Sequence, residues 1–302
     1  MKITVIVNSY NYGRYIGETL DSVLAQTLPA QQVLVVDDGS KDDSCAVIAG
    51  YAEKHPHLTL ISKENGGQLS TFNAAAPHVE GDLVFFLDSD DQWQPTYLET
   101  ITAIYRERPI DFVCCAFEEF GESNKINRKY TQDTDLGFSV AFTFFKKVCI
   151  GWPTACLSLR RTLFDKIFPI PLEEDWRVCA DLPLATGASL AGGHKFYCAS
   201  PLVLYRVHPI NATKVLQGVS DYAYRFPYTR DVLINHFCSR FHLTEKGCAE
   251  LLCDEVLVAR EDMNLSLFWR HLTALFKSHR PLLWKLGEGA KMVKKMLKQR
   301  RR

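Results

Sequence analysis

The sequence predicts an α/β protein with an open, mostly parallel β-sheet covered by helices on both faces, followed by a C-terminal helical extension. Two patterns support this prediction. Short apolar runs alternate with longer segments of helical period over residues 3–116. Within each run, polar residues do not alternate with apolar ones, as expected of strands that are buried on both faces. With 302 residues, 47% of them hydrophobic, the chain is large enough to bury such a core.

The predicted elements follow one another in β-α order. Strands are expected at 3–7, 33–36, 58–61, 83–87 and 111–116, and helices at 15–24, 46–54, 69–76 and after Pro95. Residues 118–148 are expected to form loops and a helix, and ordered segments return at 155–159 and 202–205. From residue 218 the pattern is helical, with breaks expected at Pro281 and at Gly287 and Gly289. We therefore predict a sheet domain over 1–217, with halves 1–117 and 118–217, and an extension over 218–302.

The formal net charge of zero conceals two regions of opposite charge. Of the 35 basic and 35 acidic residues, ten basic residues and one acidic residue lie from Lys277 onward, which leaves 25 basic and 34 acidic residues before it. The tail is therefore +9 and the preceding chain −9. The net negative charge of the chain before Lys277 excludes general nucleic-acid binding.

Cysteine usage and hydropathy indicate the compartment. The ten cysteines include no Cys-x-x-Cys pair, and several lie in apolar runs. The first apolar run leads directly into Asn8 without the features of a signal peptide, and no run of about 18 apolar residues occurs. We predict reduced thiols and a cytoplasmic protein.

Polar clusters follow three predicted strands at their carboxyl ends, where open α/β sheets bind ligands. They are residues 8–11 (NSYN), 37–40 (DDGS) and 88–91 (DSDD). Three carboxylates within four residues repel one another unless a cation compensates them. Oxygen ligands suit Mg²⁺ or Mn²⁺, which complete their coordination with water and substrate phosphates. The third cluster therefore predicts a divalent cation and a diphosphate ligand, with helix capping by Asp90 or Asp91 as the alternative.

Other strand-end segments are less specific. Residues 37–40 are also typical of a turn that leads into a helix. Tyr10 is either a rim aromatic or, beside a carboxylate, a residue that stacks on a nucleobase. Residues 65–68 (NGGQ) form a glycine-permitted turn that serves equally well as a plain loop or as a phosphate or sugar contact.

Taken in order, these segments resemble glycosyltransferase family 2, whose members have the GT-A fold. The resemblance is carried by residues 5–11, 35–40, 65–73 and 87–91 and continues through 180–182 (ADL) and 205–208 (YRVH), so that it covers about residues 1–215. Two positions depart from the family pattern, namely Asn8, where many members have Pro, and Phe72, where Arg often precedes the Asn. Neither affects the metal carboxylates.

The resemblance implies a metal-dependent, inverting glycosyltransferase. Its donor would be a UDP-, GDP- or dTDP-sugar, and its acceptor a hydroxyl of a glycan or lipid-linked molecule in the synthesis of cell-surface polysaccharide or glycoconjugate. Asp90, last of the D-x-D, would bind Mn²⁺ or Mg²⁺, with His208 as a further ligand or pyrophosphate contact. The implied donor contacts are Asn8 and Tyr10 in the nucleobase pocket, Asp38 on the base, Asp88 on the ribose or sugar, and Arg206.

Inverting transfer also needs a carboxylate that takes the proton of the acceptor hydroxyl. Two residues compete for this role. Asp175 lies in the local sequence Glu-Asp-Trp that resembles the family's base, whereas Asp181 has the family's spacing to Gly192 and Tyr205. We favour Asp181, with Asp175 as the alternative.

The C-terminal segment combines apolar residues, including Trp269 and Trp284, with lysines and a final Arg300-Arg301-Arg302. A basic amphipathic helix of this kind predicts an anchor on an anionic membrane surface, peripheral on the cytoplasmic face. A helix packed on the body is the alternative. A sugar nucleotidyltransferase is a second possible function, but it would have a Gly-rich loop after the first strand, which residues 8–11 do not form. A membrane-docked nucleotide-sugar binder without catalysis is a third, which the intact acids Asp88, Asp90 and Asp181 disfavour.

Overall fold

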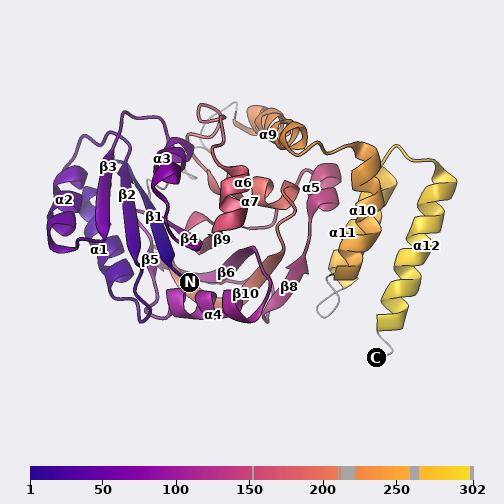
Figure 1. Cartoon of the computed structure of the whole chain (residues 1–302), viewed down its shortest axis with the longest axis horizontal. Coiled ribbons are helices and arrows are strands. Elements are labelled where there is room, and N and C mark those ends of the chain that lie inside the picture. The colour runs from indigo at the N-terminus through magenta and orange to yellow at the C-terminus, as the bar shows by residue number, and fades with distance from the viewer. Residues whose placement is uncertain (152, 210, 212–221, 259–264, 300–302) are drawn as a thin grey trace.

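The computed structural model describes residues 1–151, 153–209, 211, 222–258 and 265–299 (Figure 1). Over these residues the centre of the molecule is one sheet with the strand order β3-β2-β1-β4-β9-β6-β10-β5, to which β7 and β8 add at β6 and β10. The strands are β1 (Ile3–Ser9), β2 (Gln32–Asp37), β3 (Leu58–Ser62), β4 (Leu83–Asp88), β5 (Gln92–Trp93), β6 (Phe112–Gly121), β7 (Ile126–Asn127), β8 (Thr134–Gly137), β9 (Leu157–Arg160) and β10 (Lys195–Val207).

The sheet is parallel over its first four strands and mixed beyond them. Strands β3, β2, β1 and β4 run parallel, as predicted. Strand β9 lies antiparallel between β4 and β6, whereas β6 and β10 pair in parallel. An apolar run predicts a buried strand but carries no information on its direction, so the orientation of β9 could not be predicted.

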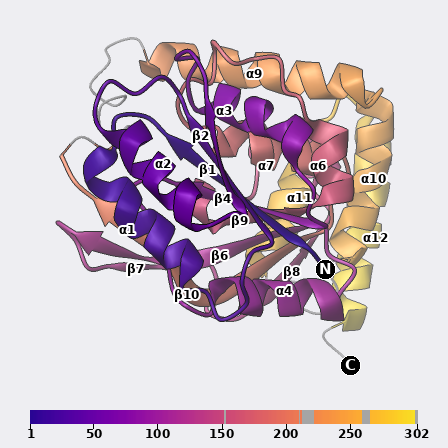
Figure 2. The same ribbon diagram turned by 60° about the vertical axis from the view of Figure 1, so that its left-hand side comes forward.

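Alternating side chains of the central strands face two cores. In β1, Val5 and Val7 pack toward α1, α2 and α4, and Ile6 packs toward α3, α6, α7 and α9. These two sets of helices cover opposite faces of the sheet (Figure 2). The bounds are α1 (Gly13–Leu24), α2 (Ser44–Lys54), α3 (Gln68–Ala75), η1 (Ala76–His78), α4 (Tyr97–Glu107), η2 (Thr154–Cys156), α6 (Arg161–Ile167), α7 (Asp181–Leu190) and α9 (Tyr222–Arg240).

The segment 118–148 contains more strand than predicted. Strand β6 continues to Gly121, and β7, β8 and α5 (Val140–Lys146) follow it. Pairing with β7 and β10 satisfies the backbone of this second half of β6, so its half-buried Glu118 and Glu119 are tolerated in a strand.

The C-terminal helices are α10 (Glu245–Val258), α11 (Leu265–Lys277) and α12 (Leu282–Gln299). Helices α10 and α11 pack against α5, and α12 packs against α10 and α11. The four helices share a small third core that includes Ala141 and Met292. Helix α12 is the outermost of them (Figure 1).

The predicted break at Pro281 is confirmed. The predicted break at Gly287 and Gly289 is wrong, because α12 continues through both residues and glycine only weakens a helix. A Cβ added at Gly289 would lie 3.4 Å from Leu272, so this glycine lies at the contact between α11 and α12. The predicted boundary at residue 218 lies outside the described residues. None of the described helices combines the length and apolar character that crossing a membrane requires.

Candidate active site

The register of the parallel strands brings the predicted strand-end residues together. Ser9 pairs with Asp37 across β1 and β2, and Asn8 pairs with Asp88 across β1 and β4. A cavity of about 1010 Å³ opens at this edge of the sheet. The predicted residues that line it are Asn8, Tyr10, Asp38, Asp88, Asp90 and Asp181.

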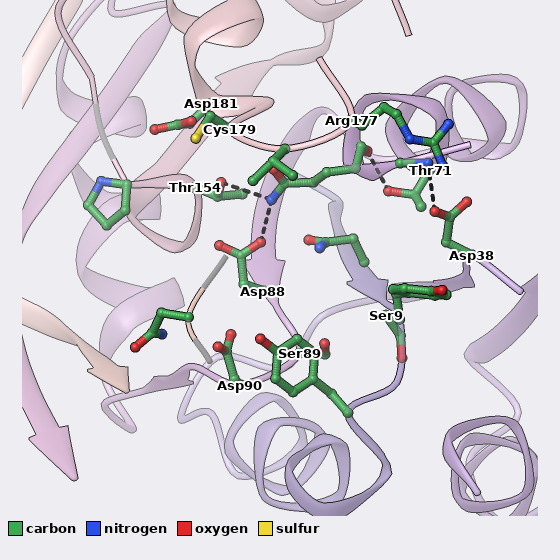
Figure 3. Close-up of a pocket in the computed structure, with 18 of the residues that line it drawn as sticks. Ser9, Asp38, Thr71, Asp88, Ser89, Asp90, Thr154, Arg177, Cys179 and Asp181 are labelled. Atoms are coloured by element: carbon green, nitrogen blue, oxygen red, sulfur yellow. Dashed lines mark hydrogen bonds between the residues drawn. The ribbon is translucent and has the colours of Figure 1, made fainter. Parts of the chain in front are cut away.

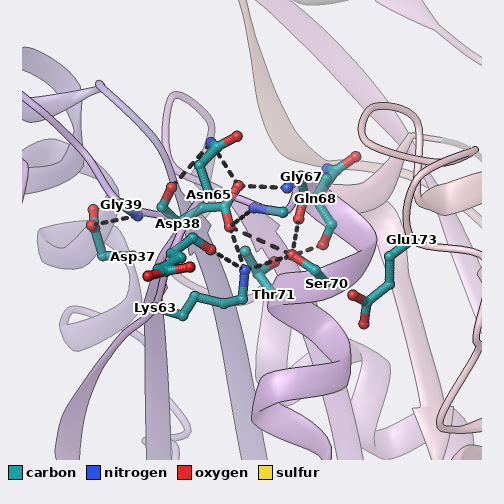
Figure 4. A network of polar contacts seen from close by, with 12 residues as sticks. Asp37, Asp38, Gly39, Lys63, Asn65, Gly67, Gln68, Ser70, Thr71 and Glu173 are labelled. Carbon is teal, nitrogen blue, oxygen red and sulfur yellow. Dashed lines mark hydrogen bonds and ion pairs between the residues drawn. The ribbon is translucent and has the colours of Figure 1, made fainter.

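Asp38 organises the turn that follows β3 (Figure 4). Its carboxylate accepts hydrogen bonds from Lys63 Nζ at 2.8 Å, the backbone N–H groups of Gly66 at 2.9 Å and Gly67 at 2.7 Å, and Asn65 Nδ2 at 3.0 Å. A carboxylate offers about four acceptor positions, so these donors occupy most of them. The structure therefore gives Asp38 a turn-holding role whatever else it contacts.

Gly67 permits this turn to approach the segment that precedes α7. Its φ of +89° is favourable only for glycine, and an added Cβ would lie 2.3 Å from the Cα of Arg177. The adjacent Gln68 N–H donates to the carbonyl of Arg177 at 2.8 Å. This contact joins the turn after β3 to the segment before α7 in the lining of the cavity.

Asp88 lies between Asp90 and Asp181 in the cavity (Figure 3). Removal from bulk water raises the pKa of Asp88 to about 7, and the charges of Asp90 and Asp181 add to the rise. Hydrogen bonds from Gln68 and Asn8 oppose it. The neighbouring Asp91 is buried behind the cavity, and burial, together with Asp90, raises its pKa well above the ordinary value.

Gln68 connects this carboxylate to α7. Its Nε2 donates to Asp88 Oδ1 at 2.6 Å, and its Oε1 accepts a hydrogen bond from the backbone N–H of Ala180 at 2.8 Å. The N–H groups at a helix start lack partners within the helix, and here a side chain from the other half supplies one. Gln68 therefore fixes the position of Asp88 relative to Asp181, the first residue of α7.

The two candidate bases lie in different surroundings. Asp181 is 6% exposed and lines the cavity. Burial raises the pKa of Asp181 to about 6, against the opposing effect of backbone N–H groups at the start of α7. Asp175 is exposed on the preceding loop and is not among the residues that line the cavity.

Two predicted residues reach Asp90 from β10 and the loop after it. His208 is 4% exposed, and its Nε2 lies 3.0 Å from Asp90 Oδ2. Arg206 donates from Nε to the backbone carbonyl of Asp90 at 2.8 Å, and its guanidinium lies 4.3 Å from the ring centroids of both Tyr15 and Phe120. The Arg206 side chain therefore holds the backbone of the D-x-D loop and is not brought into the lining of the cavity.

The side chains around Asp90 suit a cation that is held by few protein ligands. Three carboxylates crowd this region, and burial together with their mutual repulsion raises the pKa of Asp88. Within the described residues, no group of three or more His, Cys, Asp or Glu side chains is arranged to hold a metal ion. A cation at Asp90 would therefore take one or two protein ligands and complete its coordination from substrate and water, which is the usual arrangement for Mg²⁺.

Tyr12 and Lys63 are among the residues of the site that sequence reasoning missed. Tyr12 lines the cavity beside the carboxylates. Burial raises the pKa of Tyr12, and the charges of Asp90 and Asp88 add to the rise. Lys63, the ion-pair partner of Asp38, is the first residue after β3. The strand-end rule that identified the aspartates would also have found Lys63.

Comparisons with known proteins agree with this geometry. The family model for glycosyl transferase family 2 matches residues 4–168. An uncharacterized glycosyltransferase of Nostoc sp. is 34% identical over 217 residues, which are 70% of this chain and 66% of that protein, just under two thirds of its length.

Two solved structures share the fold. S. aureus TarS 1-349 in complex with UDP-GlcNAc matches 97% of this chain and 89% of that chain, with a TM-score of 0.58 and 20% identity. The mannosyltransferase PcManGT from Pyrobaculum calidifontis, in complex with GDP-Man and Mn²⁺, matches 99% of this chain and 86% of that chain, with a TM-score of 0.54 and 18% identity. The likeness confirms the predicted GT-A fold.

Proposed function

The chain belongs to glycosyl transferase family 2, and we propose that it moves a sugar from a nucleoside-diphosphate donor to a hydroxyl of a glycan or lipid-linked acceptor, in a metal-dependent, inverting reaction. The observation that carries this proposal is the convergence of Asp88, Asp90 and Asp181, from both halves of the domain, on one cavity. A role in cell-surface polysaccharide or glycoconjugate synthesis is part of the proposal.

We place the nucleotide along the ends of β1 and β2. Tyr10 is 44% exposed at the rim and offers a ring on which a base can stack, with Asn8 beside it. Because hydrogen bonds within the turn already engage Asp38, its contact with the base would come in addition to its support of residues 65–67. UDP-GlcNAc and GDP-Man, bound by the two structural neighbours, are the first donors to test.

The diphosphate would lie beside Asp90. We propose that Asp90 and His208 hold Mn²⁺ or Mg²⁺, which when bound would offset the negative charge that develops on the leaving diphosphate. Arg206 positions Asp90 through the backbone carbonyl, and Asp88 contacts the ribose or the sugar.

Asp181 is proposed as the general base. The acceptor oxygen forms a bond to the anomeric carbon as the bond from that carbon to the diphosphate oxygen breaks, and the hydroxyl proton passes to the Asp181 carboxylate. The nucleoside diphosphate leaves with the bonding electron pair. A pKa of about 6 keeps Asp181 ionised near neutrality yet basic enough to accept the proton.

A donor screen tests the proposed function. UDP, GDP, dTDP and their sugars are added to the full chain with and without Mn²⁺, and the unfolding midpoint and nucleotide release are measured. Since a ligand that binds only the native state stabilises it, we expect one nucleotide class to raise the midpoint in a metal-dependent manner and its sugar to be turned over. Binding without turnover would favour the catalytically inactive assembly partner, and no binding by any nucleotide would overturn both functions.

Helix α12 supports a second proposal, that the protein docks peripherally on the anionic cytoplasmic face of a membrane. One face of α12 packs through Met292, as the packed-helix alternative expects. The other face exposes an apolar row with Lys291 and Lys294 beside it. The exposed apolar residues are Leu282, Leu283, Leu286, Val293 and Leu297. Insertion of this row, with about 1 kcal/mol from each lysine near anionic lipid, would hold the helix at the surface. Arg300, Arg301 and Arg302 lie outside the described residues.

We expect the double substitution Leu283→Glu with Leu286→Glu to reduce binding to phosphatidylglycerol vesicles at least tenfold in a sedimentation assay. Both side chains are more than half exposed, so the unfolding midpoint should not move. Val148→Glu, at an exposed position outside α12, is the matched control. Truncation at Pro281 is less informative because it also removes Met292 from a buried cluster. Equal vesicle binding by the double variant and the wild type would leave only the packed-helix interpretation.

A further inference from the structure

A second group of side chains lines the same cavity from β6, β7 and β10. It consists of Phe117, Glu119, Asn127 and Tyr205. Pairing places Phe117 opposite Asn127 of β7, and Glu119 opposite Tyr205 of β10. Because side chains alternate along a strand, all four lie on one face of three adjacent strands. Neither the proposed donor site nor the proposed base uses them.

This face combines aromatic surface with strong hydrogen-bond acceptors. The rings of Phe117 and Tyr205 lie 5.5 Å apart between centroids and are tilted by 55°. Glu119 accepts hydrogen bonds from Asn127 Nδ2 at 2.8 Å and from the Ser123 hydroxyl. The Ser123 bond lowers the pKa of Glu119, so its carboxylate is ionised at neutral pH.

A pyranose ring presents the two surfaces that such a face complements. Its C–H side packs on an aromatic ring, and its hydroxyl groups donate to a carboxylate or pair with an amide. Hydrogen bonds to an ionised acceptor are the stronger kind. A uronic acid or a sugar phosphate would instead place its charge beside Glu119, in a cavity that already contains Asp88 and Asp181. Such repulsion selects against anionic ligands.

We propose that Phe117, Glu119, Asn127 and Tyr205 form the acceptor subsite and that it takes an uncharged pyranose. This inference rests on the proposed function, because it supplies the sugar whose hydroxyl Asp181 would deprotonate. It also extends that function by naming the chemical class of the acceptor.

Binding can be tested without knowing the donor. Methyl glycosides of neutral hexoses, and of hexuronic acids as the charged counterparts, are added to the full chain with UDP and Mg²⁺, and saturation-transfer NMR reports their contact with the protein. We expect a signal for at least one neutral glycoside, none for the uronides, and at least a fivefold loss of the signal in Tyr205→Ala. Tyr228→Ala, at a tyrosine that is 71% exposed and is not among the residues lining this cavity, is the control.

Two variants that each replace a glutamate with glutamine test the selection against anionic sugars. Glu119→Gln should raise the acceptor KM for a neutral glycoside about tenfold, the effect of losing a hydrogen bond to a charged group, and should narrow the preference for neutral over uronide acceptors by a similar factor. The KM for the donor should stay within twofold in Glu119→Gln, because Glu119 is not one of the proposed donor contacts. Glu118→Gln removes the same charge one residue away, on the opposite face of β6, and should change neither quantity.

The outcomes separate this subsite from the function on which it rests. Uronides that bind as well as neutral glycosides, or a donor KM that rises as much as the acceptor KM in Tyr205→Ala, would overturn the subsite. Donor turnover that no neutral glycoside accelerates would also overturn the subsite, because the donor site would then work without an acceptor subsite for neutral sugars. A chain that binds no nucleotide at all fails at the proposed function instead.

Discussion

Replacing Asp181 with Asn is expected to lower sugar transfer by about 10²–10⁴-fold, the usual contribution of a general base, while donor affinity stays within about twofold. The amide keeps the shape of the side chain but cannot accept the acceptor proton. Initial rates of transfer measure the first quantity, and calorimetric titration with the donor in Mg²⁺ measures the second. The split between the two readouts is the signature of a residue that acts on the proton and not on the donor.

Asp175→Asn is the matched control for this substitution. Asp175 is exposed and does not line the cavity, so its replacement should leave transfer within about twofold. If Asp175→Asn removes transfer and Asp181→Asn does not, the choice of base is wrong although the fold and the donor site remain as described.

The pH profile gives an independent readout for Asp181. Its pKa is raised to about 6 by burial, and the active form is the ionised carboxylate. Activity should therefore be constant above about pH 7 and should fall tenfold per pH unit below pH 6, where the carboxylate binds a proton. The acid limb should be absent from the residual activity of Asp181→Asn. The profile is measured at saturating donor and Mn²⁺, because Asp88, a proposed contact of the donor, has a pKa that burial raises to about 7.

Asp90→Ala is expected to lower turnover by about 10²–10³-fold, the cost of losing one group that stabilises charge in a transition state. Its carboxylate lines the cavity, and His208 contacts it at 3.0 Å. Chelation by EDTA should inactivate the wild type to a similar degree and should have little further effect on the variant. Nucleotide release in the presence and absence of Mn²⁺ measures both effects.

Asp165→Ala removes an exposed carboxylate that pairs with Arg161 outside the cavity, and it should retain both activity and metal dependence. Turnover that survives in Asp90→Ala after EDTA treatment would remove the cation from the mechanism. It would leave the assignment of the donor site to Asn8, Tyr10 and Asp38 untouched.

Much of the fold, and the meeting of the strand-end residues at one edge of the sheet, could be predicted because two local rules determine them. Unbroken apolar runs predict buried parallel strands, and such strands end at one edge of the sheet. Residues 8–11, 37–40 and 88–91 were therefore expected together, and the pairing of Asn8 with Asp88 confirms it. Asp181 lies far along the chain from these residues, and only its spacing in a known family placed it with them.

What could not be predicted depends on contacts between distant segments. The hydrogen bonds of Gln68 to Asp88 and Ala180 join residues that no local pattern relates. The hydrogen bonds that the Asp38 carboxylate accepts from Gly66 and Gly67 could not be predicted either. Arg206 was expected among the donor contacts, and the strand alternation of β10 instead directs it to the backbone of Asp90. In each case the distinguishing information is the direction of a side chain after packing.

The proposed reaction depends on a cation held at Asp90 against the diphosphate of the donor. The most direct measurement is anomalous diffraction at the manganese edge from crystals of the full chain grown with UDP and Mn²⁺. We predict one peak within coordination distance of the Asp90 carboxylate and of the UDP phosphates. Density for UDP in the cavity with no manganese peak at Asp90, or with the peak elsewhere, would contradict the account.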